Sequence, residues 1–326
     1  MNPRDIVRCN LDFTKPPRIG LNFDRGRRDD FCWGGIGPSS VWRERRWVEG
    51  NIEYYDDEWG NVWHRVSDMS SGGEVWQPAL ADWSALRAYQ LPDLATPGRY
   101  EAVRQLFTQD HEHYHMASLP GFPFAICRYL RKMEIYLQDL VLERECVDEL
   151  HDRVTTLLEQ VIERFAQAGA DGVFFCEDWG TQERLLVSPS MWRDIYKPLY
   201  LRLCSRAHHL GLHVIMHSCG YDWAILDDLA ETGVNCFQFD QPELYGLERL
   251  ADKLHNLHMC LFSPVDIQQT LPTGDHRRIV GAARRMVSLF GGVHGGFIAK
   301  NYSDLVGIGV KPEWDDWAYQ AFLETM

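Results

Sequence analysis

The sequence lacks the features that mark membrane, secreted and nucleic-acid-binding proteins. No apolar run reaches the length of a membrane span, and the first 14 residues carry charges without an apolar core, so we expect no signal peptide. Acidic residues outnumber basic ones by 47 to 33, which gives a net charge of −14 and an isoelectric point near 5.4. An acidic chain is poorly suited to nucleic acids or anionic membranes, so we expect neither as a partner.

The cysteines lack the pattern of a disulfide framework. There are nine of them, an odd number, and they are scattered along the chain. Cys176, Cys236 and Cys260 lie in apolar runs, where a thiol acts as a small apolar side chain. This usage predicts a cytoplasmic protein in a reducing compartment.

A Gly-x-Gly-x-x-Gly loop, the signature of dinucleotide-binding folds, is also missing. What the chain does have is a regular alternation of apolar strands and amphipathic helices. We predict strands at 172–176, 213–217, 235–239, 258–262 and 296–299, and helices at 146–168, 189–210, 223–232, 245–254, 275–289 and 312–326. This alternation indicates a parallel sheet covered by helices. We predict one domain, 1–326, folded as a (β/α)8 TIM barrel, with an open doubly wound sheet as the alternative.

One of these strands ends in a pair of metal-ligand residue types. In the stretch Val214–Gly220, His217 and Cys219 are two residues apart, and alternate side chains of an extended segment share a face. Imidazole nitrogen and thiolate sulfur are both ligands of zinc. The pair therefore predicts a metal site at a strand end, although a buried histidine beside an inert thiol would have the same spacing.

The preceding predicted strand ends in two acids, Glu177 and Asp178, within the segment Ala170–Gly180. The pieces Asp-Trp-Gly-Thr-Gln and His-Ser-Cys-Gly follow one another in the chain about one βα unit apart. In this order the chain, from about residue 54 to its end, resembles the uroporphyrinogen decarboxylase superfamily. Within that superfamily it is similar to the corrinoid-dependent methyltransferase-like branch.

The resemblance implies a TIM barrel, a zinc ion and a corrinoid carried by a partner protein; a homodimer is also in keeping with it. In that branch zinc is held by a His-x-Cys pair and a later cysteine, and it activates a thiol for methyl transfer. His217 and Cys219 match the pair, but no cysteine follows Cys260. We therefore expect Glu177 or Asp178 to complete the site, with Glu177 as the predicted third ligand and Asp178 as a catalytic acid.

Residues 31–95 are rich in Trp, Gly and Asp, and 52–64 reads as two short strands around Asp57-Glu58-Trp59-Gly60. Similar proteins carry this segment in an N-terminal elaboration that covers the barrel mouth, which we place at about residues 30–95. Trp59 is predicted to contact a flat substrate there, although such a residue can also simply pack the hairpin onto the body of the protein.

Polar residues follow several predicted strands, and in a parallel barrel the carboxyl ends of the strands meet at one mouth. We predict Lys300 and Tyr302 as catalytic groups. The remaining predicted substrate-binding residues are Asp24, Arg25, Gln182, Asp240 and Gln241.

These features predict a metal-dependent methyltransferase or demethylase that acts on a small methylated substrate, such as an O-methyl compound. The methyl group would pass to a corrinoid protein or a thiol. One alternative is a metal-free lyase of the decarboxylase type that uses Arg25 and Asp24, although the decarboxylase signature Met-Arg-Gln-Ala-Gly-Arg is absent. The other alternative is a barrel that binds a small molecule without catalysis.

Overall fold

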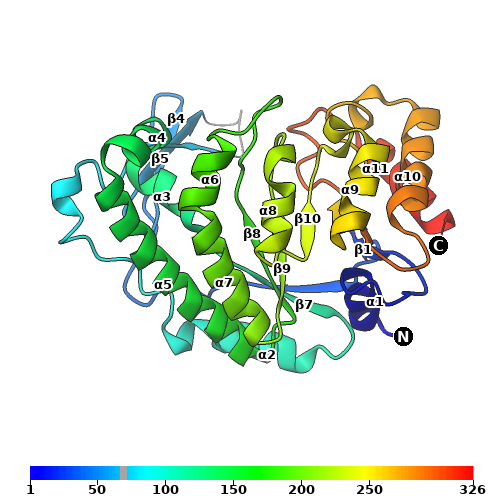
Figure 1. Ribbon diagram of the computed structural model, residues 1–326, viewed down its shortest axis with the longest axis horizontal. Coiled ribbons are helices and arrows are strands. Elements are labelled where there is room, and N and C mark those ends of the chain that lie inside the picture. The colour runs from blue at the N-terminus through cyan, green and yellow to red at the C-terminus, as the bar shows by residue number, and fades with distance from the viewer. Residues whose placement is uncertain (67–71, 326) are drawn as a thin grey trace.

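The computed structural model describes residues 1–66 and 72–325 (Figure 1). Eight parallel strands form one nearly closed sheet in the order β1-β12-β11-β10-β9-β8-β7-β2, which confirms the predicted (β/α)8 barrel. They are β1 (Gly20–Asn22), β2 (Phe31–Gly34), β7 (Tyr114–Ser118), β8 (Gly172–Cys176), β9 (His213–His217), β10 (Cys236–Gln238), β11 (Cys260–Ser263) and β12 (Phe297–Lys300).

Helices cover the outside of this sheet, and α5 to α8 form a layer in front of the strands in Figure 1. They are α1 (Pro3–Leu11), α2 (Glu101–Gln109), α3 (Pro123–Arg131), α4 (Met133–Leu142), α5 (Arg144–Ala168), α6 (Pro189–Ile195), α7 (Lys197–His209), α8 (Leu226–Glu231), α9 (Leu247–Leu257), α10 (His276–Phe290) and α11 (Pro312–Glu324). Short 3-10 turns lie at η1 (Trp83–Ala85), η2 (Pro97–Tyr100), η3 (Trp223–Ile225), η4 (Pro242–Tyr245) and η5 (Leu271–Thr273). Within the described residues, none of the helices has the length and apolar character needed to cross a membrane.

The predicted elements agree with the observed ones, with shifts of a few residues at their ends. The long helix α5 buries Val154, Leu158 and Val161 on one face and ends at Gly169, whose φ of +94° suits glycine. The predicted helix 189–210 is instead two helices, α6 and α7. Pro198 lies in the first turn of α7. Because proline has no backbone N–H, it cannot donate the hydrogen bond that would join α6 and α7 into one continuous helix.

The N-terminal end of the barrel is closed by α1. Val7 and Leu11 of this helix join the cluster of buried side chains inside the barrel, which includes Tyr114, Ile215 and Phe262. Arg4 and Arg8 of α1 pair with Asp171, which directly precedes β8. The carboxyl ends of the strands therefore form the end of the barrel that α1 leaves open.

A second, antiparallel sheet of four strands holds β3 (Arg46–Glu49), β4 (Ile52–Asp56), β5 (Val62–Val66) and β6 (Glu74–Gln77). It contains the predicted hairpin, with the turn at residues 57–60. The sheet lies beside α3 and α4 (Figure 1), and the ring of Trp63 meets that of Tyr129 at 4.7 Å. Because α3 follows the carboxyl end of β7, the sheet lies on the open side of the barrel. The predicted range 30–95 also contains β2, which belongs to the barrel itself.

Candidate metal centre

The loops that follow β8 and β9 are in direct contact at two glycines. A Cβ atom on Gly220 would lie 2.1 Å from the carbonyl oxygen of Gly180, a distance that no side chain can occupy. Gly220 also has a φ of +88°, and the amide of Tyr221 donates to the carbonyl of Thr181 at 2.8 Å. The two glycines of the sequence motifs thus allow the loops to touch.

The other residues of the two motifs hold this contact in register. Trp179 is completely buried and stacks on Phe124 with ring centroids 4.2 Å apart, and its amide donates to Ser218 Oγ at 3.2 Å. The Asp178 carboxylate accepts a hydrogen bond from the Cys219 amide at 2.8 Å. Asp178 is therefore fixed beside the His-x-Cys pair by the backbone of the neighbouring loop.

Asp178, His217 and Cys219 bring one oxygen, one nitrogen and one sulfur ligand atom together, all within 4.8 Å of one another. His217 Nε2 lies 3.4 Å from Cys219 Sγ and 3.7 Å from Asp178 Oδ1. Ligands held 2.0–2.3 Å from a tetrahedral zinc ion are roughly 3.3–3.8 Å apart. The donor set and these two distances therefore fit zinc.

The hydrogen bonds behind His217 fix which ring nitrogen faces this cluster. Gln238 donates through Nε2 to Asp240 Oδ1 at 2.7 Å, so its amide oxygen faces His217 Nδ1, also at 2.7 Å. Nδ1 must then carry the hydrogen, and Nε2 presents its lone pair to Cys219 and Asp178. Lys300 Nζ donates to the same Asp240 oxygen at 2.9 Å. Such a second layer of hydrogen bonds is typical of metal-binding histidines.

Two thiols lie at this end of the barrel. Burial, reinforced by Asp178 and Asp240, raises the pKa of Cys219 to about 12, so the metal-free thiol is protonated at neutral pH. Cys176 is the register partner of His217 in the next strand and is exposed. Desolvation and the nearby carboxylate of Asp178 raise its pKa to about 11. The sequence analysis placed Cys176 in an apolar strand, and only the register reveals a second sulfur beside the site.

The prediction that Glu177 is the third ligand is wrong, because Glu177 points away from His217 and Cys219. Successive residues of an extended strand point to opposite sides, so Glu177 and Asp178 cannot face the same cluster. Glu177 is completely buried among the helices, where it accepts hydrogen bonds from the Ala125 amide at 2.9 Å and from the Tyr200 hydroxyl. This burial raises the pKa of Glu177 to about 7.

Asp24 and Arg25, predicted to bind substrate, are engaged elsewhere. Arg25 pairs with Asp315 of α11 at 2.7 Å and with Asp24 at 3.2 Å. Asp24 also pairs with Arg27 at 3.0 Å, and its amide donates to Asn301 just after β12. The two residues stand at the rim next to α11, and their charges are already paired there.

Some of the other predicted residues lie near the site, and others pack into the body of the protein. The Lys300 ammonium lies 6.0 Å from the Tyr302 ring, and burial together with the charges of Asp240 and Cys219 raises the pKa of Tyr302. Gln182 donates to Gln241 at 3.2 Å, which joins the loops after β8 and β10. The half-buried Trp59 packs against the core, and its carbonyl accepts from Tyr89.

The sequence matches the model of a known protein family. Residues 68–325, well over half of it, match the model of the family described as uroporphyrinogen decarboxylase (URO-D). The chain belongs to the uroporphyrinogen decarboxylase family. A search of curated proteins found no significant match.

Solved structures show which fold this family member shares. A methyltransferase from Methanosarcina mazei is similar with a TM-score of 0.61 and 16% identity, over 82% of this chain and 76% of that one. A D-psicose 3-epimerase from Clostridium cellulolyticum H10 is more distant, with a TM-score of 0.44 and 8% identity, over 74% of this chain and 86% of that one. At such identities the likeness to the methyltransferase concerns the fold alone.

One charged residue of this family member was missed by the sequence analysis. Arg128 of α3 reaches the cluster, with Nη2 3.8 Å from Asp178 Oδ2. Nothing in the local sequence distinguishes it from Arg131 of the same helix, which is buried in an ion pair with Asp139. Only the docking of α3 against the end of β8 reveals its position.

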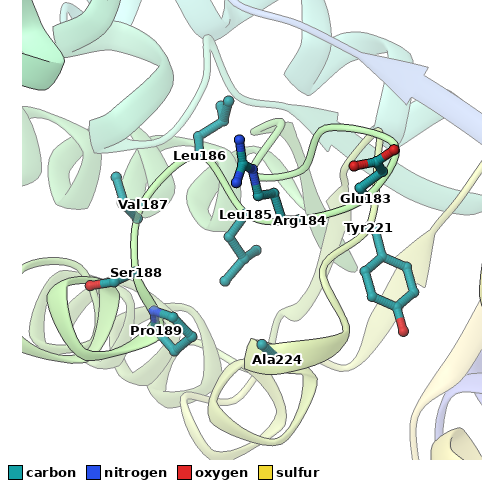
Figure 2. A pocket seen from close by; sticks show the side chains of 9 residues that line it. All are labelled: Glu183, Arg184, Leu185, Leu186, Val187, Ser188, Pro189, Tyr221 and Ala224. Carbon is teal, nitrogen blue, oxygen red and sulfur yellow. The ribbon is translucent and has the colours of Figure 1, made fainter.

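A groove of about 540 Å³ lies behind the contact of the two loops and is lined by residues 183–189 together with Tyr221 and Ala224. Figure 2 shows Leu185 pointing into the space between the 183–189 segment and Ala224. None of the metal-ligand candidates lines this groove. It is thus separate from the cluster at the strand ends.

Proposed function

We propose that this family member is a zinc-dependent methyltransferase that removes a methyl group from a small O-methyl substrate. The observation that carries the proposal is the donor set of Asp178, His217 and Cys219 at the open end of the barrel, with the lone pair of His217 Nε2 directed at the other two ligands. The shared fold with a methyltransferase from Methanosarcina mazei supports it.

The protein side chains would divide the chemistry between them. Bound zinc would polarise the substrate oxygen or a thiol, as a Lewis acid does. Asp178, His217 and Cys219 would hold the ion, and Cys176 lies beside His217 in the strand register but outside this group of ligand atoms. Gln238 holds the histidine tautomer, and Asp240 holds Gln238.

The transfer breaks the bond between oxygen and the methyl carbon. The bonding electron pair stays on the oxygen, and the methyl carbon bonds to a strong nucleophile, either the cobalt(I) of a corrinoid on a partner protein or a thiolate sulfur. The leaving oxygen then takes a proton. Tyr302 and Lys300, which lie beside Asp240 at the same end of the barrel, are the proton donors of this proposal.

The lyase alternative is less well supported. It needs Arg25 to bind a substrate carboxylate, whereas Arg25 is paired with Asp315 and Asp24. Breaking these pairs would offset part of any gain from binding a substrate. The binding-barrel alternative is a barrel that binds a small molecule without turnover, and the absence of a cysteine after Cys260 is what favours it.

The test combines metal content with turnover. We expect about one zinc per chain by elemental analysis after reconstitution, and none in His217→Ala/Cys219→Ala with unchanged thermal unfolding. Zinc-loaded protein should also transfer a methyl group from 4-methoxybenzoate to free cob(I)alamin, seen as the change in the corrinoid absorption spectrum. Failure to bind zinc or any other transition metal would refute the metal site, and zinc binding without transfer to cobalamin or to a thiol would favour the binding barrel.

A further inference from the structure

Two consecutive residues after β8 bind helix α3 to the metal centre. The Glu177 carboxylate accepts a hydrogen bond from the amide of Ala125, in the first turn of α3, at 2.9 Å. The next residue, Asp178, faces Arg128 about one turn further along the same helix, with Arg128 Nη2 3.8 Å from Asp178 Oδ2. Glu177 is thus not a metal ligand, but it anchors the helix that carries an arginine to a proposed ligand.

Contacts with its own neighbours hold the Arg128 guanidinium in place. The side chain is only 13% exposed, and its guanidinium lies 4.9 Å from the ring of Tyr129 and 5.2 Å from the ring of Phe124. Nη2 also donates to the Tyr129 hydroxyl at 3.0 Å. A planar guanidinium that is already held by such contacts loses little conformational freedom when it orients a carboxylate.

The two oxygens of Asp178 have different neighbours. Oδ1 accepts a hydrogen bond from the Cys219 amide at 2.8 Å and lies 3.7 Å from His217 Nε2, so it is the oxygen that faces the other two ligand residues. Oδ2 is the oxygen that lies near Arg128. The positive charge of the guanidinium attracts Oδ2 and opposes its rotation toward a metal ion bound through Oδ1.

The number of Asp178 oxygens that bind decides whether the metal keeps a free position. Asp178, His217 and Cys219 supply three ligands, and a catalytic zinc ion needs a fourth position for water or substrate. A cysteine ligand binds through its single sulfur, but no cysteine follows Cys260, and a carboxylate can bind through one oxygen or through two. A second bound oxygen would occupy the position that the substrate needs. Arg128 cannot stabilise the ion directly, because two positive charges repel each other, so its effect must act through Asp178.

We propose that Arg128 is a positioning residue that makes Asp178 bind the metal through one oxygen only, and so keeps a coordination position open for the substrate. The inference rests on the proposed function, because it needs a metal ion at Asp178, His217 and Cys219. Outer groups that orient a ligating side chain are typical of metal sites. An ion pair as loose and as exposed as this one contributes little to the stability of the fold, so its effect is expected at the metal.

The experiment replaces zinc by cobalt(II), whose visible absorption is strong in a four-coordinate site and weak in a five-coordinate one. The cobalt-loaded full chain of the wild type should show the four-coordinate spectrum. Arg128→Met should shift the spectrum toward the five-coordinate form and still bind cobalt at least as tightly as the wild type, because a ligand oxygen is gained and a positive charge is removed. Arg128→Lys keeps the charge and should keep the wild-type spectrum. Arg104→Met on α2 loses the same charge from an exposed pair with Glu101 and is the control.

Ethanethiol is the probe for the open position, and its binding is followed by the thiolate-to-cobalt absorption. The Arg128→Met protein should bind ethanethiol at least about tenfold more weakly than the wild type, because the thiol must displace the second Asp178 oxygen. Arg128→Lys should bind it as the wild type does. A purely structural role of Arg128 would instead weaken cobalt binding in Arg128→Met and leave the coordination number unchanged.

The outcomes separate the inference from the proposed function. A five-coordinate spectrum of the wild type would overturn the inference whether or not the variants fold, and so would a wild-type spectrum in Arg128→Met. Arg128→Gln, which has a side chain of similar polarity without the charge, takes the place of Arg128→Met if that protein does not fold. If the metal content is normal in these cases, the proposed metal site stands. A chain that takes up neither zinc nor cobalt would instead overturn the proposed function and the inference with it.

Discussion

Strand β9 carries a histidine at each end, and the two histidines have different partners. The end of the barrel that α1 closes is called the lower end, and the open end, at the carboxyl ends of the strands, is called the upper end. At the lower end His213 uses both ring nitrogens, with Nε2 2.9 Å from Asp12 and Nδ1 2.8 Å from the Tyr114 hydroxyl. At the upper end His217 uses Nδ1 for Gln238, while Nε2 faces the potential ligands Cys219 and Asp178. The same residue type, four positions apart on the same face of one strand, is a structural group at one end and a candidate metal ligand at the other.

The difference lies in what covers each end. Helix α1 closes the lower end with apolar side chains, and its arginines pair with Asp171, so polar groups there gain protein partners. The upper end is formed by loops whose carboxylate, thiol and imidazole groups converge on one another. Polar groups that have hydrogen-bond partners stabilise the fold, whereas converging ligand atoms favour the binding of a metal ion. This contrast can be tested at both ends of the barrel.

The largest effect is expected from replacing the two histidines in parallel. His217→Ala removes a proposed ligand and should weaken zinc binding by at least about 100-fold, more than loss of an outer hydrogen bond does. His213→Ala should leave the zinc affinity unchanged and lower the free energy of unfolding by about 1–3 kcal/mol, because the Tyr114 hydroxyl loses a buried partner. Competition with a chromophoric chelator and urea denaturation measure the two quantities. Equal zinc affinities in the two variants would contradict the distinction.

A substitution at the contact between the loops after β8 and β9 should have nearly as large an effect. Gly220→Ala places a Cβ atom against Gly180 at a φ of +88°, and we expect a loss of about 3–5 kcal/mol in unfolding free energy together with weaker zinc binding. Gly211→Ala is the matched control, because its φ is +78° but no atom of the described residues lies within 4 Å of the added Cβ. If both variants lose the same stability, backbone strain alone explains the effect and the loop contact does not.

A pH dependence should arise from Glu177, which lies behind the upper end. Its pKa is about 7 in the folded protein, against an ordinary value of 4.5. Between these values the folded state holds a proton that the unfolded state has released, so the free energy of unfolding falls as pH rises. The total loss by neutral pH and above is about 3 kcal/mol.

Glu177→Gln keeps an oxygen that accepts from the Ala125 amide and turns an amide nitrogen, which donates, toward the Tyr200 hydroxyl. It should remove this pH dependence, measured by urea denaturation from pH 5 to 8. Glu183→Gln, a nearby exposed position, is the control and should behave as the wild type. A Glu177→Gln protein with an unchanged pH profile would show that another group is responsible.

The smallest effect concerns the hydrogen bond that orients His217. Gln238→Leu removes the acceptor for Nδ1, so the ring loses its fixed tautomer, and we expect zinc affinity to fall by about 10–100-fold. Thermal unfolding of the metal-free protein, measured alongside, shows whether the fold survives. Unchanged zinc affinity in a folded Gln238→Leu protein would mean that the tautomer does not need this support.

The sequence predicted the second part of the barrel. Apolar strands alternating with amphipathic helices predicted β8 to β12, α5 and the helices that follow it, with α6 and α7 as one helix, because burial of an apolar face depends on local periodicity. The strands β1, β2 and β7 were not among the predicted strands. The pairing of His217 with Cys219 was also predictable, since alternate residues of one extended segment share a face. The same alternation explains why Glu177 is not part of the cluster. Glu177 and Asp178 are successive residues after β8, so only one of them, Asp178, faces His217 and Cys219.

Tertiary structure alone decided what surrounds that pair. Asp178 reaches Cys219 because Gly180 and Gly220 let two loops touch, Cys176 joins through strand register, and Arg128 arrives on a helix from a different part of the chain. The register of Cys176 and the contacts of Asp178 and Arg128 depend on the positions of segments that are distant in sequence. Local pattern determines which face of an element is buried, but the identity of the atoms that meet across elements depends on how the whole barrel packs.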